Sequence, residues 1–192
     1  MASRSASIVR ETREVRVTAT VKLEPGEIVI ETGIPFFDHM VETLLYYAGF
    51  SGSVEAVEIK KVDDHHVIED VALALGEVLR RAAGQRVRRF GHAVIPMDEV
   101  LVMAAVDYSG RPHASVDLPF TRQEVGGMSL EMVPHFYWSL ASTLRATIHV
   151  LTLRSGNNHH MAEASFKAVG ASLGQALAPS QTVFSTKGML DV

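Results

Sequence analysis

The sequence predicts an α+β fold made of two fused, duplicated half-domains, each a small mixed sheet with helices packed on one face. Two observations support this prediction. The expected order of strands and helices occurs twice, and the motif His-His-x-x-Glu begins at His65 and again at His159, 94 residues later. In addition, His39 and His135 are 96 residues apart, each near the start of the first expected helix of its half. Internal repetition of this kind indicates duplicated structural units.

The first half reads as strand, strand, helix, strand, helix. Residues 14–23 alternate between apolar and polar side chains, which is typical of a strand. Pro25 and the glycine after it are a turn signal, so the next strand is expected to be its hairpin partner. Asp38 is the expected N-cap of the first helix, and Gly49 follows its end. The expected elements are strands over residues 14–23, 27–31 and 54–59 and helices over residues 37–48 and 63–83.

The second half repeats the same order. Its expected elements are strands over residues 99–106, 113–118 and 148–154 and helices over residues 133–145 and 158–177. The period is far longer than that of solenoid repeats, so we expect two half-domains that share one compact domain. The expected boundary separates residues 1–92 from residues 93–192.

The composition limits the classes of function. A net charge of −4 gives no sign of a nucleic-acid partner, which would favour a basic excess. The absence of cysteine excludes disulfides, thiolate metal sites and a cysteine nucleophile. The first seven residues are polar, and no apolar run reaches the roughly 20 residues that span a bilayer. We therefore expect a cytoplasmic protein with neither a nucleic-acid nor a membrane partner.

The repeated motif can carry metal chemistry. On a helix, side chains three or four positions apart share a face, so His66 is expected to point with Glu69. His65 is rotated from His66 by about 100° and points elsewhere. The second motif repeats this arrangement, with His160 beside Glu163. Each motif thus offers one His-plus-Glu pair and one diverging histidine.

Two such motifs facing each other can build two metal sites. Each site would take the His-plus-Glu pair of one motif and the diverging histidine of the other, and His39 and His135 would complete one site each. Imidazole and carboxylate ligands suit zinc, manganese, iron, cobalt or nickel, so the metal stays open at this point. The other histidines lack such company and are expected not to be ligands: His92, His113 and His149.

The motifs together resemble the imidazoleglycerol-phosphate dehydratase family over nearly the whole chain. The resemblance lies in the segments Arg10-Glu11-Thr12-Arg13-Glu14, Gly33-Ile34-Pro35-Phe36-Phe37-Asp38-His39-Met40, Asp63-Asp64-His65-His66 closing on Glu69-Asp70, Arg89-Phe90-Gly91, Asp98-Glu99, Ser109-Gly110-Arg111-Pro112, His135-Phe136, His159-His160-Met161-Ala162-Glu163-Ala164-Ser165-Phe166-Lys167-Ala168 and Ser185-Thr186-Lys187-Gly188.

This resemblance implies a lyase of histidine biosynthesis that removes water from imidazole glycerol phosphate to give imidazole acetol phosphate. It also implies two manganese ions per active site and a shell of 24 identical subunits with active sites between subunits. By the same resemblance, one metal ion would take His39, His66, Glu69 and His159. The other would take His65, His135, His160 and Glu163.

The resemblance also implies the substrate contacts. The substrate phosphate would bind to Arg89, Arg111, Lys167, Ser185 and Lys187, a donor set that suits an anion. Metal ions on both ring nitrogens would favour an imidazolate intermediate that expels the neighbouring hydroxyl. Glu14 is the expected proton shuttle and substrate contact, and Glu163 the second catalytic carboxylate.

Two other functions use the same residues. A metal-dependent hydrolase of a small phosphate ester could activate water with these ligands, and release of inorganic phosphate would identify it. A shell that only stores metal gives no reason for the phosphate-binding set. Absence of turnover by a metal-loaded protein would favour storage.

Overall fold

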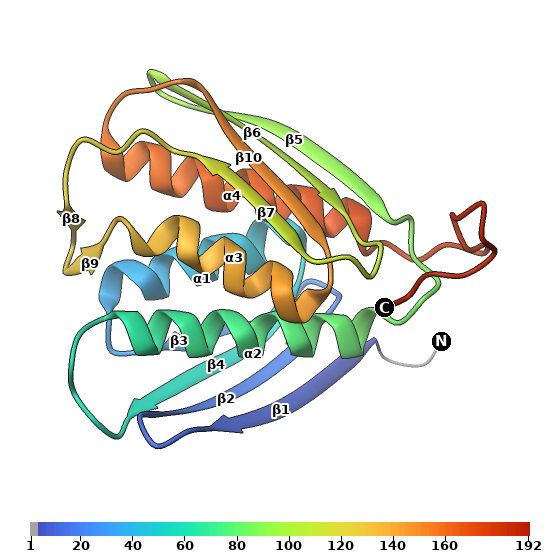
Figure 1. The fold of residues 1–192 in the computed structure, drawn as a ribbon, viewed down its shortest axis with the longest axis horizontal. Helices are drawn as coiled ribbons and strands as arrows, with labels where there is room; N and C mark the ends of the chain where they lie inside the picture. The colour runs from blue at the N-terminus through green and yellow to red at the C-terminus, as the bar shows by residue number, and fades with distance from the viewer. Residues whose placement is uncertain (1–3) are drawn as a thin grey trace.

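The computed structural model describes residues 4–192, in which a layer of helices lies between two sheets on the outside of the molecule (Figure 1). The first sheet contains β1 (Ser5–Glu11), β2 (Val15–Lys22), β3 (Ile28–Glu31) and β4 (Ser51–Glu58). The second contains β5 (Phe90–Met97), β6 (Val100–Asp107), β7 (His113–Asp117) and β10 (Thr147–Arg154). The helices are α1 (Pro35–Ala48), α2 (His65–Ala83), α3 (Met132–Leu144) and α4 (Asn158–Ala176). Strands β8 (Glu124–Val125) and β9 (Met128–Ser129) form a small hairpin.

Both sheets have the same topology, which confirms the predicted α+β duplication. Their strand orders are β1-β2-β4-β3 and β5-β6-β10-β7. In each sheet the third strand along the chain pairs in parallel with the fourth, β3 with β4 and β7 with β10, while the other pairs are antiparallel. β1 therefore corresponds to β5, β2 to β6, β3 to β7, and β4 to β10.

The predicted hairpin between residues 14–23 and 27–31 is wrong. β2 pairs with β1 and β4, and β3 lies on the far side of β4. The turn at Pro25 does reverse the chain, but β4 lies between the two strands and offers each of them a hydrogen-bonding edge.

The strands β1 and β5 were not predicted, and both are edge strands. In β1 only Ile8 is fully buried, so the strand has no alternating apolar pattern. β5 contains Pro96, which lowers its strand propensity but is tolerated at a sheet edge.

Helices join the two halves at the centre of the molecule. α2 packs on β1 and β2, and α4 packs on β5 and β6. Across the halves, α1 packs on α4 and α2 on α3, so the helices of both halves share one apolar core. This packing brings the start of α1 to α4 and the start of α3 to α2.

The helix ends differ in part from the prediction. α1 begins at Pro35, with Ile34 as its N-cap, rather than at Asp38. The carboxylate of Asp38 instead accepts hydrogen bonds from the backbone and hydroxyl of Thr32, which join the helix to β3. Gly49 ends α1 in a left-handed conformation, as expected.

The second sheet begins with β5 at Phe90, near the expected half-domain boundary at residue 92. Residues 1–3 of the expected first half-domain lie outside the described residues. Within residues 4–192, none of the helices is both long and apolar enough to cross a membrane.

Candidate metal centre

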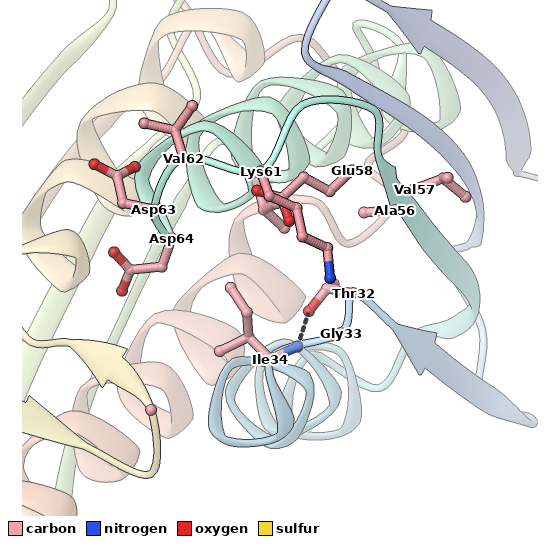
Figure 2. A pocket seen from close by; sticks show the side chains of 12 residues that line it. Thr32, Gly33, Ile34, Ala56, Val57, Glu58, Lys61, Val62, Asp63 and Asp64 are labelled. Carbon is pink, nitrogen blue, oxygen red and sulfur yellow. Dashed lines mark hydrogen bonds between the residues drawn. The ribbon is translucent and has the colours of Figure 1, made fainter.

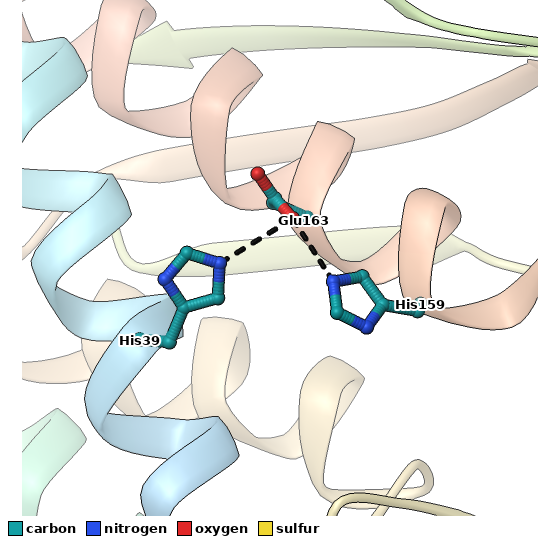
Figure 3. A group of neighbouring side chains, drawn as sticks. All are labelled: His39, His159 and Glu163. Carbon is teal, nitrogen blue, oxygen red and sulfur yellow. Dashed lines mark hydrogen bonds and ion pairs between the residues drawn. The ribbon is translucent and has the colours of Figure 1, made fainter.

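One group of expected ligands forms where α1 meets α4. Figure 3 shows His39 from α1 and His159 from α4 converging on Glu163, one turn further along α4. Nε2 of His159 lies 3.1 Å from Oε2 of Glu163, and Nε2 of His39 lies 3.4 Å from the same oxygen. One ligating atom of each residue lies within 4.8 Å of the others. We call this group the α1/α4 cluster.

Glu163 is the buried member of the α1/α4 cluster, with 8% of its surface exposed. Its Oε1 also accepts a 2.9 Å ion pair from the Lys167 ammonium. Burial would raise the pKa of Glu163, but Lys167 and the hydrogen bonds from His159 and His39 together hold that pKa below its ordinary value. The carboxylate is therefore ionised at neutral pH and available as a ligand or as a proton acceptor.

A second group forms where α2 meets α3, and we call it the α2/α3 cluster. Nε2 of His65 lies 3.5 Å from one oxygen of Glu69, and Nε2 of His135 lies 3.8 Å from the other. The rings of His65 and His135 are 4.6 Å apart. Nε2 of His135 is buried and has no hydrogen-bond partner within residues 4–192. A buried nitrogen of this kind fits the role of a metal ligand, because leaving a buried polar atom unsatisfied costs about 1–3 kcal/mol.

The second histidine of each motif faces a different carboxylate. Nε2 of His66 lies 3.3 Å from Oε2 of Glu14, and Nδ1 of His160 lies 3.2 Å from Oε2 of Glu99. Nδ1 of His66 is a further buried nitrogen without a hydrogen-bond partner among the described residues.

The expected pairing inside each motif is therefore wrong for the single chain. The glutamate meets the histidine four positions before it, not the one three positions before it. Both spacings share a helix face, and side chains lean toward the helix N-terminus, so Glu69 reaches back to His65. The neighbouring β1–β2 turn supplies Glu14, which holds His66.

The described chain does not gather either expected set of four ligands within 4.8 Å. His39 and His159 lie in the α1/α4 cluster, whereas His66 and Glu69 lie on α2. The other expected set is divided in the same way. Each cluster therefore contains only part of each ligand set that the resemblance implies.

Most of the expected phosphate-binding residues lie at the other end of the molecule. The guanidinium of Arg89 donates to both oxygens of Asp107, at 2.7 and 3.1 Å, and to the carbonyl of Phe184 at 3.1 Å. The largest effect on the Arg89 pKa is this hydrogen bond to Asp107, which raises it above the usual value. Arg111 is exposed and lies 3.8 Å from the same carboxylate.

The C-terminal segment completes this group. A cavity of about 420 Å³ is lined by Arg89, Phe90, Val183, Phe184, Ser185 and Thr186. The hydroxyl of Ser185 accepts a hydrogen bond from the backbone of Lys187. Arg89, Arg111, Ser185 and Lys187 therefore lie in one region of the molecule, and we call these four residues the basic cluster.

Lys167 is separate from the basic cluster, because it lies on α4 against Glu163. The backbone N–H of Arg89 donates to the carbonyl of Ala176, at the end of α4. Ala176 is 13 residues beyond Glu163, which corresponds to about 20 Å along the helix. Within one chain, the basic cluster therefore lies about 20 Å from the α1/α4 cluster.

A pocket of about 550 Å³, lined by both polar and apolar side chains, adjoins the start of α2 and was not foreseen from the sequence. Figure 2 shows Asp63, Asp64 and Lys61 around it, opposite the loop at Thr32. Asp64 is fixed there, since its carboxylate accepts 2.6 and 3.1 Å hydrogen bonds from the backbone and hydroxyl of Ser129. The carboxylate of Asp63 accepts from the backbone of His65, which anchors the first turn of α2.

Two further residues were also missed as parts of the site, Glu99 beside His160 and Asp107 beside Arg89. Glu99 was visible only as part of the Asp98-Glu99 segment, and its contact with His160 spans 61 residues. Of the histidines expected not to be ligands, His113 and His149 lie together on the second sheet, with ring centres 5.7 Å apart, and His92 lies on β5.

The comparisons with known proteins agree over most of the chain. A family model for imidazoleglycerol-phosphate dehydratase matches residues 32–173. The protein named imidazoleglycerol-phosphate dehydratase in Caldivirga maquilingensis is 50% identical to the chain, covering 97% of this chain and 99% of its own. The protein of the same name in Metallosphaera sedula is 44% identical, covering 98% of this chain and 100% of its own.

Solved structures are similar as well. The imidazoleglycerol-phosphate dehydratase of Staphylococcus aureus has a TM-score of 0.83 and 31% identity, covering 92% of this chain and 99% of its own. The structure of IGPD from Pyrococcus furiosus in complex with (S)-C348 has a TM-score of 0.85 and 37% identity, covering 95% and 100%.

Proposed function

The chain belongs to the imidazoleglycerol-phosphate dehydratase family, a family of hydro-lyases, and from that premise we propose that its two ligand clusters are halves of a dimanganese active site. The enzyme removes water from imidazole glycerol phosphate in histidine biosynthesis. One observation carries the proposal: six of the eight expected ligands lie in the α1/α4 and α2/α3 clusters. The other two, His66 and His160, directly follow His65 and His159 in the chain, and His160 groups with Asp98 and Glu99.

The ligand atoms suit manganese. Imidazole nitrogens and carboxylate oxygens, with no thiolate, are donors that this ion accepts. The buried Nε2 of His135 has no hydrogen-bond partner among the described residues. A bound ion would satisfy a nitrogen of this kind. When bound, the manganese ions supply Lewis acidity that favours the anionic imidazolate form of the substrate ring.

We propose that the active site forms between chains. Each set of four ligands needs residues from both clusters, and one chain keeps the clusters apart. Contact between the α1/α4 cluster of one subunit and the α2/α3 cluster of another would supply both sets. The 24-subunit shell implied by the resemblance provides repeated contacts of this kind, and we place it in the cytoplasm.

The position of the basic cluster also supports an active site formed between chains. Only three carbons separate the ring from the phosphate in imidazole glycerol phosphate, so the substrate cannot span about 20 Å. Arg89, Arg111, Ser185 and Lys187 would therefore bind the phosphate of a substrate whose ring lies on the metal ligands of other subunits. Lys167, beside Glu163, would reach the substrate from the metal side.

Glu14 is the proposed proton shuttle. Its carboxylate lies 3.3 Å from Nε2 of His66, on the ligand side of that ring, and is partly exposed. It would give a proton to the hydroxyl group on the carbon attached to the imidazole ring, so that this C–O bond breaks and water leaves. It would accept the proton from the adjacent carbon, and the resulting enol becomes the ketone of the product. The ionised Glu163 is positioned to assist this transfer.

The test is turnover of imidazole glycerol phosphate by manganese-loaded protein, measured as formation of the enolisable ketone. The variant His65→Ala/His160→Ala removes a proposed ligand from each half of the chain and should lower the activity by about 100-fold or more. The matched control, His113→Ala/His149→Ala, removes two histidines outside the clusters and should retain it.

Two results would contradict the proposal. Release of inorganic phosphate would identify a hydrolase, and absence of turnover by protein that holds both metal ions would favour metal storage. The second result would refute catalysis without refuting the metal centre.

A further inference from the structure

The duplication gives Glu14 a counterpart in the second half. Glu14 ends the turn between β1 and β2 and directly precedes the buried Val15. Glu99 ends the turn between β5 and β6 and directly precedes the buried Val100. Because the sheets share one topology, the two glutamates occupy equivalent places. Each contacts the second histidine of the motif in its own half, His66 or His160.

The two carboxylates meet different nitrogens of their rings. Glu14 lies against Nε2 of His66, the nitrogen farther from the backbone. Glu99 lies against Nδ1 of His160, the nitrogen nearer the backbone. A carboxylate accepts hydrogen bonds, so Nδ1 of His160 is the donor in this contact, and Nε2 is the ring nitrogen that does not contact Glu99. Nε2 of His160 is then the atom free to bind a metal ion.

Glu99 is held in place on both of its oxygens. Oε1 accepts a 2.6 Å hydrogen bond from the backbone of Asn157, the N-cap of α4, while Oε2 contacts His160. The hydrogen bond from Asn157 is the largest of the effects that lower the pKa of Glu99. Glu99 therefore joins the β5–β6 turn to the first turn of α4, which carries the second motif.

Gly156 provides the space for this contact. A Cβ atom added at Gly156 would collide with Cγ and Oε1 of Glu99. No backbone atom is among those colliding atoms, so alanine at this position would displace a flexible side chain while the fold is kept. The chain thus offers a way to move Glu99 without changing either Glu99 or His160.

We propose that Glu99 is a positioning residue that holds His160 with Nε2 directed to the metal ion, whereas its counterpart Glu14 stays on the ligand side and moves protons. A carboxylate behind a metal-binding imidazole fixes its tautomer and orientation. Asp98 does not take this role, because its exposed carboxylate lies 3.7 Å from Nε2 of His160, on the ligand side. The inference rests on the proposed metal centre.

The experiment is calorimetric titration of metal-free, assembled protein with manganese, together with the electron paramagnetic resonance spectrum of the bound ion. In wild type we expect two classes of site. Glu99→Ala should weaken only the site that contains His160, by about 10- to 100-fold, and alter the spectrum of that ion. Glu99→Gln should weaken it less, since the amide oxygen still accepts a hydrogen bond.

Gly156→Ala provides an independent variant if Glu99→Ala does not assemble. It should weaken the same site, and the double variant Gly156→Ala/Glu99→Ala should bind no more weakly than Glu99→Ala, because both changes act through one side chain. Glu24→Gln removes an exposed charge in the turn after β2 and should bind as wild type does.

Unchanged titrations for the Glu99 variants would overturn the positioning role, and so would equal weakening of both sites. Additive losses in the double variant would show that Gly156 acts by another route. A wild-type protein that binds no manganese would overturn the metal centre and this inference with it. If the wild type binds manganese and turns over the substrate while the Glu99 variants bind manganese as the wild type does, this inference alone is overturned.

Discussion

At the scale of single residues, the identity of the expected ligands could be read from the sequence but their partners could not. The spacing predicted that His66 shares a helix face with Glu69 and that His65 points elsewhere. Which histidine meets Glu69 depended on the lean of the side chains and on Glu14, which arrives from another element. Contacts between distant residues decided the geometry of the motif.

Arg89 gives a prediction at this scale. Its planar guanidinium donates to both oxygens of Asp107 and to the Phe184 carbonyl, a geometry that an ammonium group cannot reproduce. Arg89→Lys should raise KM for imidazole glycerol phosphate by about tenfold or more while the protein still binds manganese. Steady-state kinetics with a parallel metal titration would measure both. An unchanged KM would contradict the role of Arg89 in phosphate binding.

A second residue-scale prediction concerns alkaline pH. Burial raises the pKa of Tyr137 well above its usual value, and burial raises the pKa of Tyr108 to about 12. The unfolded state therefore loses these protons first, at about pH 10. Stability is fully present below pH 10 and falls above it, by at most about 1.4 kcal/mol per pH unit for each tyrosine.

Denaturant unfolding at pH 9 and pH 11 checks this expectation. Tyr137→Phe removes the 2.8 Å hydrogen bond to Ser165 and should cost about 1 kcal/mol at pH 9. Its further loss between pH 9 and pH 11 should be smaller than that of wild type. If both proteins lose the same free energy of unfolding between pH 9 and pH 11, Tyr137 does not cause the loss of stability at alkaline pH.

At the scale of elements, close packing of helices brings the ligands together. Gly170 and Gly174 of α4 lie against the backbone of α1, where an added Cβ would meet the carbonyls of Leu44 and Ala48. Since α1 carries His39 and α4 carries Glu163, the distance between these helices sets the α1/α4 cluster. Gly76 of α2 faces the backbone of α3 in the same way.

Gly170→Ala tests this dependence. The new methyl group would collide with a backbone carbonyl, which cannot move aside as a side chain can, so the variant should lose about 1–3 kcal/mol of stability. It should also weaken manganese binding at the site that uses His39. Denaturant melts and titrations measure the two effects. Wild-type stability would mean that α1 and α4 separate without cost.

Edge strands set the limit of prediction at this scale. β1 and β5 have one face covered by helices and carry polar, glycine or proline residues that interrupt the apolar alternation. They could be recognised only once β2 and β6 were seen to offer them an edge. The small β8–β9 hairpin was missed because its strands are two residues long.

At the scale of the whole molecule, one chain holds its metal-ligand clusters far from its basic cluster, although the proposed reaction needs both at one active site. The ligand clusters lie at the starts of helices, and the basic cluster lies near the end of α4. This separation is the reason for the proposed assembly between chains.

Mixing two inactive variants tests assembly directly. One variant, His65→Ala, damages the α2/α3 cluster and keeps the basic cluster intact. The other, Arg89→Ala, damages the basic cluster and keeps the α2/α3 cluster intact. If the groups of one active site come from different chains, joint refolding of the two variants should restore part of the activity. Each variant refolded alone is the control. Absence of any recovery in mixed particles would favour active sites contained within one chain.

Metal removal gives a second prediction at this scale. Ligand sets divided between chains would make manganese part of the subunit contact, so chelation should convert the large particle into smaller species. Readdition of manganese should reverse the change. Size-exclusion chromatography with light scattering measures it, and an unchanged particle without metal would refute the dependence of assembly on metal.

Sequence patterns alone were sufficient to predict the duplicated α+β organisation, the helices that carry the histidine motifs and a site built from imidazole and carboxylate groups. These features follow from local periodicity and from the spacing of a few residue types, which are properties of the chain. The three-dimensional packing was needed to establish the strand order, the histidine that meets each glutamate, the contact of Glu99 with His160 and the separation of the basic cluster from the ligand clusters. Those features depend on which elements pack against each other, and packing is fixed by the burial of many side chains at once.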